Sequence, residues 1–130
     1  MPQDRESGRR ASKWGRDVGA RIAEAIGAVK LRSGSNECLF RQRRVVIKCA
    51  HERTRYVGVL SDMLLRLDEI IGAFERTDGA FDMRVLTRDE YLRLMRPSRS
   101  RSHVPHRGQQ VRRRDFEAHG AYMTTIRLSH

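Results

Sequence analysis

The period with which apolar residues recur changes along this 130-residue chain, and this change restricts the possible folds more than any other feature. Some segments repeat apolar residues every three or four positions, which is typical of a helix with one buried face. Other segments alternate apolar and polar residues, which is typical of a half-buried strand. A chain of this length that uses both periods predicts one small α/β domain with a mixed α+β sheet.

Two segments have the helical period. The first runs from about Trp14 to Gly27, where a glycine suits a helix end. The second, residues 56–74, has the longest apolar stripe and is the strongest helix prediction, and we expect the stripe to lie in the core. Its members are Val57, Leu60, Met63, Leu64, Leu67, Ile70, Ile71 and Phe74.

The clearest strand pattern lies between the two predicted helices. Residues 38–40 and 45–50 flank a charged stretch and predict a β-hairpin with a four-residue loop, after a first short strand at 28–32. Pairing Phe40 with Val45 puts one apolar set on a single face, whereas a slip by one residue would divide it between two faces. That set is Cys38, Phe40, Val45, Ile47 and Cys49.

The remaining segments predict shorter elements. Residues 77–79 predict a turn, residues 81–85 a strand, and the Thr87/Glu90 capping box a short helix before Pro97. A last helix is expected over 111–119 and a closing strand over 122–128. The predicted order is α-β-β-β-α-β-α-(basic loop)-α-β. It divides the chain into a basic tail (1–13), an α/β core (14–96), a flexible linker (97–110) and a C-terminal helix with its strand (111–130).

Positive charge is concentrated rather than spread. The net charge is +11, yet residues 17–95 have nearly balanced charges, whereas residues 96–114 contain seven arginines and no acid. Two cysteines without metal-ligand spacing indicate small buried residues of a reducing compartment. With no apolar run that suits a signal peptide or membrane span, we expect a cytoplasmic protein.

The arginines predict the partner. A planar guanidinium binds phosphate oxygens in pairs and stays charged, so clustered arginines favour nucleic acid, DNA or RNA. An anionic protein or a membrane surface is an alternative, as is a solvated charged loop. The expected nucleic-acid contacts are Arg41, Arg43 and Arg44 on the hairpin and Arg96, Arg99, Arg101, Arg107, Arg112, Arg113 and Arg114 around the linker.

Glu37 enters one hairpin strand, and in the predicted register Lys48 lies directly across from it on the next strand. With a helix before the hairpin and a helix and strand after it, this arrangement resembles the restriction-endonuclease-like, PD-(D/E)xK, nucleases. The resemblance implies a DNA nuclease in which Glu37 helps to hold Mg²⁺, Lys48 stabilises charge and Glu24 is an accessory acid. Val46 stands where that family has its second metal-binding acid. The other reading of Glu37 and Lys48 is a cross-strand ion pair.

Three functions therefore remain open from the sequence. The chain is expected to bind nucleic acid through its arginines, with no cofactor implied. If the resemblance holds, it is a Mg²⁺-dependent nuclease. A third possibility is a non-catalytic interaction or accessory protein, which a large exposed apolar patch would indicate.

Overall fold

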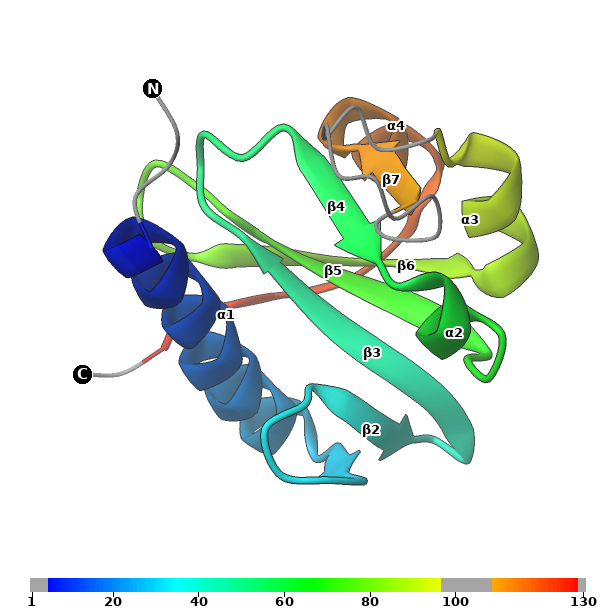
Figure 1. Ribbon diagram of the computed structural model, residues 1–130, viewed down its shortest axis with the longest axis horizontal. Coiled ribbons are helices and arrows are strands. Elements are labelled where there is room, and N and C mark those ends of the chain that lie inside the picture. The colour runs from blue at the N-terminus through cyan, green and yellow to red at the C-terminus, as the bar shows by residue number, and fades with distance from the viewer. Residues whose placement is uncertain (1–4, 97–108, 129–130) are drawn as a thin grey trace.

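The computed structural model describes residues 5–96 and 109–128. Within them the chain forms a small mixed α/β domain, as the sequence predicts (Figure 1). The elements in chain order are α1 (Arg5–Ile26), β1 (Val29–Lys30), β2 (Glu37–Phe40), β3 (Arg43–Ala50), β4 (Tyr56–Val59), α2 (Ser61–Leu64), β5 (Glu69–Glu75), β6 (Phe81–Thr87), α3 (Arg88–Leu94), β7 (Gln109–Arg112), α4 (Arg113–His119) and β8 (Ala121–Ile126).

Six strands form one mixed sheet, in the order β1-β2-β3-β5-β6-β8, and β4 and β7 form a separate antiparallel ribbon. Only the central pair β3–β5 is parallel. Parallel neighbours need a crossover between them, and here the crossover contains β4 and α2.

Each face of the sheet has its own apolar core. On one face α1 packs through Val18, Ile22 and Ala23 against β3, β5 and β6. On the other face the β4–β7 ribbon and helices α2, α3 and α4 pack against the same strands (Figure 1). The central strand β5 is therefore buried on both faces, which explains why its five inner residues are all buried.

The hairpin prediction is confirmed, but its register is wrong by two residues. Phe40 pairs with Arg43 rather than Val45, and the loop has two residues, Arg41 and Gln42, with φ of 51° and 66°. Two residues of positive φ match the twist of a tight hairpin. A shift by two keeps the same face inward, so the predicted apolar set does lie together against α1. Burial alone could not distinguish the two registers.

The predicted helix over residues 56–74 is wrong. This segment forms strand β4, the single turn α2 and strand β5. The cause is the double burial of β5, because a strand covered on both faces has a continuous apolar run that periodicity cannot separate from a buried helix.

The other predicted elements agree with the structure in kind, except that residues 111–112, predicted to begin the last helix, belong to strand β7. The Thr87/Glu90 capping box is present at the start of α3, and Gly79 has a positive φ in the predicted turn before β6. Helix α1 begins at Arg5, so residues 5–13 are helical rather than a tail. Residues 109–110 belong to β7 rather than to the linker, whose residues 97–108 lie outside the described part of the chain.

Candidate nucleic-acid interface

The predicted arginine clusters lie in two separate places. Arg41 is in the turn between β2 and β3, at the lower right of Figure 1, whereas residues 112–114 join β7 to α4 at the top. Arg96 lies beside the second cluster, because its backbone pairs with that of Gln110. The other predicted contacts, Arg99, Arg101 and Arg107, lie outside the described residues.

Two of the three hairpin arginines are paired with acids of the same chain. The Arg43 Nη1 atom lies 2.6 Å from Glu69 Oε2, and Arg44 pairs with Glu37. The Arg41 guanidinium lies 4.9 Å from the centre of the Phe40 ring and is exposed. The hairpin therefore offers one guanidinium without an acidic partner, rather than the predicted three.

The second cluster forms a concave surface of about 540 Å³, which we call the β4–β7 arginine pocket. The β4–β7 ladder places Tyr56 directly across from Arg112. The loop before β4 and the first turn of α4 supply the other walls. The lining residues are Glu52, Arg55, Tyr56, Arg112, Arg113, Arg114 and Glu117.

Arg113 holds this pocket together. Its side chain is only 13% exposed, and its Nη1 donates to the carbonyl oxygens of His51 at 2.7 Å and Glu52 at 3.0 Å. The Arg113 Nη2 donates to the Glu75 carbonyl, and its backbone N–H donates to the Arg55 carbonyl at 2.7 Å. These bonds fix the loop of residues 51–55 against β7. Arg113 was expected to bind phosphate, but its guanidinium is committed to the protein itself.

Three other arginines of the pocket remain available. Within the described residues, the side chains of Arg55, Arg112 and Arg114 make neither an ion pair nor a hydrogen bond. Of the two acids in the lining, Glu117 is paired with Arg113. Beside them the Tyr56 side chain is exposed, at 47% of its surface. Arg55 and Tyr56 were missed by the sequence analysis, because both stand next to or inside the segment that was predicted to be a helix.

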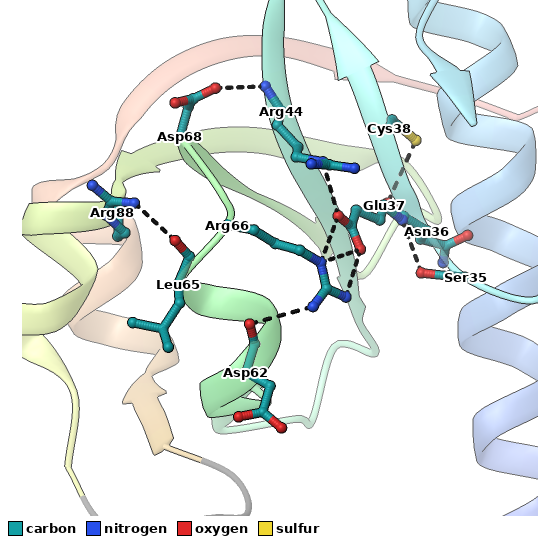
Figure 2. A network of polar contacts seen from close by, with 10 residues as sticks. All are labelled: Ser35, Asn36, Glu37, Cys38, Arg44, Asp62, Leu65, Arg66, Asp68 and Arg88. Carbon is teal, nitrogen blue, oxygen red and sulfur yellow. Dashed lines mark hydrogen bonds and ion pairs between the residues drawn. The ribbon is translucent and has the colours of Figure 1, made fainter. Parts of the chain in front are cut away.

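Glu37 is buried in a cluster of arginines (Figure 2). Its carboxylate has no exposed surface and accepts hydrogen bonds from Arg66, from Nε at 3.0 Å and from Nη2 at 3.0 Å. Arg44 Nε lies 3.1 Å away and makes an ion pair without hydrogen-bond alignment. The hydrogen bonds from Arg66 lower the pKa of Glu37 below its ordinary value, although burial opposes this. A carboxylate that is neutralised in this way is a poor ligand for Mg²⁺.

Lys48 does not face Glu37. The residue across from Glu37 is Val46, and Lys48 lies further along β3, beside Gly72 of β5. Glu24, the predicted accessory acid, is exposed on α1. In the described part of the chain, no group of three or more His, Cys, Asp or Glu side chains is placed to hold a metal ion. The expected cross-strand pair of Glu37 and Lys48 is therefore absent from the hairpin, because Val46 takes the position opposite Glu37.

None of the helices in residues 5–96 and 109–128 has the length and apolarity needed to cross a membrane. The sequence matches no known protein-family model, and no curated protein is significantly similar to it.

Proposed function

We propose that this protein binds nucleic acid at the β4–β7 arginine pocket. The observation that carries the proposal is the meeting of Arg55, Arg112 and Arg114, without acidic partners, around the exposed ring of Tyr56. Guanidinium groups bind phosphate oxygens in pairs and release the counterions that screen the phosphates. The tyrosine supplies a flat apolar surface on which an unpaired base can stack.

The ring of Tyr56 favours a single strand over a duplex. A base is available for stacking only when it is not already stacked and paired, so an exposed aromatic residue among arginines suits single-stranded DNA or RNA. The sequence adds further arginines at 99, 101 and 107, in the segment that leads into β7. These arginines are expected to add further phosphate contacts.

The test is fluorescence anisotropy with single- and double-stranded DNA and RNA at several salt concentrations. Each phosphate contact contributes about 0.7 (single strand) to 0.9 (duplex) to the slope of log affinity against log salt. Replacing Arg55, Arg112 and Arg114 by glutamine should therefore make the slope shallower by roughly 2 to 3. The matched control replaces Lys30, Arg32 and Arg93, which are exposed and lie outside the pocket, and so removes the same charge.

The control variant should keep the slope of the wild-type protein. An equal loss in both triple variants would show that net charge alone attracts the strand, and it would contradict a site at the pocket. Tyr56→Ala tests the preference for a single strand: it should weaken single-strand binding about tenfold or more and leave duplex binding nearly unchanged.

A further inference from the structure

A second cavity, of about 480 Å³, shares no lining residue with the arginine pocket. Its walls come from α1, the loop before β2, the middle of β3 and α2, which Figure 1 shows around β3. We call it the Lys48 cavity. Its lining residues are Gly15, Arg16, Gly34, Ser35, Asn36, Val46, Ile47, Lys48, Cys49 and Met63.

The cavity exists because β3 continues to Ala50, beyond Val46, the last β3 residue that pairs with β2. The β2–β3 ladder stops at Glu37 and Val46, with one more bond from the Ile47 N–H to the Asn36 carbonyl. Residues 48–50 of β3 continue without a strand beside them on this side. Because alternate residues of a strand direct their N–H groups to the same side, the Cys49 N–H points toward this open edge, as that of Ile47 does.

As far as residues 5–96 and 109–128 form them, the walls of the Lys48 cavity have positive charge and no negative charge. The lining contains Lys48 and Arg16 but neither aspartate nor glutamate. Within the described residues, neither cation has an ion pair or a hydrogen bond from its side chain. Lys48 is half-buried, and burial lowers the pKa of its ammonium group. An ammonium group that is taken out of water without a partner is unfavourable, and an anion in the cavity would relieve this cost.

The loop before β2, which forms one wall of the cavity, is bonded to α1. The Asn36 Nδ2 atom donates to the Gly15 carbonyl at 3.0 Å, and its amide fills the space where a Cβ atom would stand on Gly19. The Ser35 Oγ atom accepts from the Glu37 N–H. These contacts fix the loop before β2 against α1, so this wall of the cavity is formed before a ligand arrives.

We propose that the Lys48 cavity binds a small ligand through an oxyanion, a phosphate or carboxylate group that Lys48 and Arg16 hold together. The volume suits a small molecule, and the apolar side chains of Val46 and Met63 would contact its uncharged part. This site is independent of nucleic-acid binding at the arginine pocket. The same oxyanion chemistry could instead come from a phosphate of a bound strand, and the experiment separates the two sources.

The chain contains only three lysines, Lys13, Lys30 and Lys48, which allows a direct test. Lys13 and Lys30 are exposed and serve as internal references. The full-length protein is treated briefly with acetic anhydride, and the acetylation rate of each lysine is measured by peptide mass spectrometry. Pyrophosphate, citrate, a single-stranded oligonucleotide or sodium chloride at equal ionic strength is added in separate samples.

Pyrophosphate or citrate should slow the acetylation of Lys48 about tenfold at ten times its Kd, because only unoccupied protein reacts. The rates of Lys13 and Lys30 should change less than about twofold on the same reasoning. Arg16→Gln should weaken this protection, whereas Arg93→Gln, an exposed arginine on α3, should keep it. Equal protection of all three lysines would overturn the proposal. So would protection of Lys48 by the oligonucleotide alone, or unchanged protection in Arg16→Gln.

Calorimetry with pyrophosphate gives a second measurement that does not depend on the reactivity of Lys48. Binding should be present in the wild-type protein and in Arg93→Gln. It should be at least about tenfold weaker in Lys48→Met, which keeps much of the side-chain volume but removes the charge. Circular dichroism confirms that each variant is folded. Absence of binding to the folded wild-type protein would overturn the proposal and leave the arginine pocket untouched.

Discussion

Glu37→Gln tests how much the buried carboxylate of Glu37, through its contacts with Arg66 and Arg44, contributes to the stability of the protein. The Glu37 carboxylate is completely buried and accepts hydrogen bonds from Arg66, which precedes β5, while Arg44 of β3 pairs with it (Figure 2). Glutamine has nearly the same shape, so the substitution removes the charge and changes little else. It also turns one acceptor into an NH₂ donor that faces a guanidinium group.

The expected loss can be derived from these contacts. Hydrogen bonds to a charged partner contribute about 1.5–3 kcal/mol each, against about 0.5–1.5 kcal/mol for neutral ones. Glutamine keeps one acceptor oxygen and adds a poorly placed donor, whose burial costs about 1–3 kcal/mol. Both guanidinium groups are partly exposed and can regain water, which reduces the total. We expect a decrease of about 3 kcal/mol in the free energy of unfolding, a large part of the stability of a small domain.

The pH dependence gives the test a second, independent result. The pKa of Glu37 is lowered in the folded protein, chiefly by the hydrogen bonds from Arg66. Its stabilisation is therefore complete above the unfolded-state pKa and is lost as the pH falls through the lower, folded-state pKa. The glutamine of the variant cannot titrate, so the gap between wild-type protein and variant should persist at pH 5 and close only below the ordinary glutamate value of 4.5.

Urea unfolding at pH 7, 5 and 3 measures the gap, and Glu24→Gln is the matched control. Glu24 is exposed on α1, so its substitution should change stability by less than about 0.5 kcal/mol at every pH. A Glu37→Gln variant as stable as the Glu24→Gln variant would refute the assigned role of the buried carboxylate. A gap that already closes above pH 5 would refute the lowered pKa.

Three further variants test local features of the fold by urea or thermal unfolding. Replacing Arg41 by asparagine and Gln42 by glycine should stabilise the protein by about 1 kcal/mol, because both positions have positive φ; no gain would contradict the two-residue turn. Gly19→Ala should destabilise by about 1–3 kcal/mol, because its Cβ atom would overlap the Asn36 amide; a gain, as helix propensity alone predicts, would contradict that contact. Thr87→Ala should reduce stability by about 1 kcal/mol through loss of the α3 cap, and an unchanged melting temperature would show that the capping box adds nothing.

The period of an element is visible in the sequence where the element has one buried face and is hidden where it has two. Strand β6 is half-buried and α1 packs with one face, so their periods are visible in the sequence. Strand β5 is covered on both faces, and its residues were assigned to a helix. Gly72, which lies in its middle, was a signal against that helix, since glycine there is unfavourable by about 1 kcal/mol. In the structure the space beside Gly72 is filled by the rings of Phe74 and Phe116.

The register of the hairpin could not be predicted from the sequence for a different reason. Turns of two residues with positive φ usually contain asparagine, aspartate or glycine, and this turn has Arg41 and Gln42. With no such signal in the sequence, burial was the only criterion, and burial is unchanged by a shift of two. This error in register also affected the predicted nuclease site, because Val46 rather than Lys48 lies opposite Glu37.

The arginines show why a count of charges along the sequence does not identify the guanidinium groups that are free to bind a partner. From their positions in the sequence, Arg43, Arg44, Arg112 and Arg113 were all predicted to contact nucleic acid. In the structure, Arg43, Arg44 and Arg113 pair with acids or backbone carbonyls of the protein itself. Tertiary contacts determine which guanidinium groups bind to other parts of the protein. These contacts join segments that are distant in sequence, so the sequence pattern does not reveal them. Under the proposed function, phosphate contact is then expected from the arginines without an internal partner. By this reasoning Arg55, which belongs to neither predicted cluster, is a stronger candidate for phosphate contact than Arg43 or Arg113.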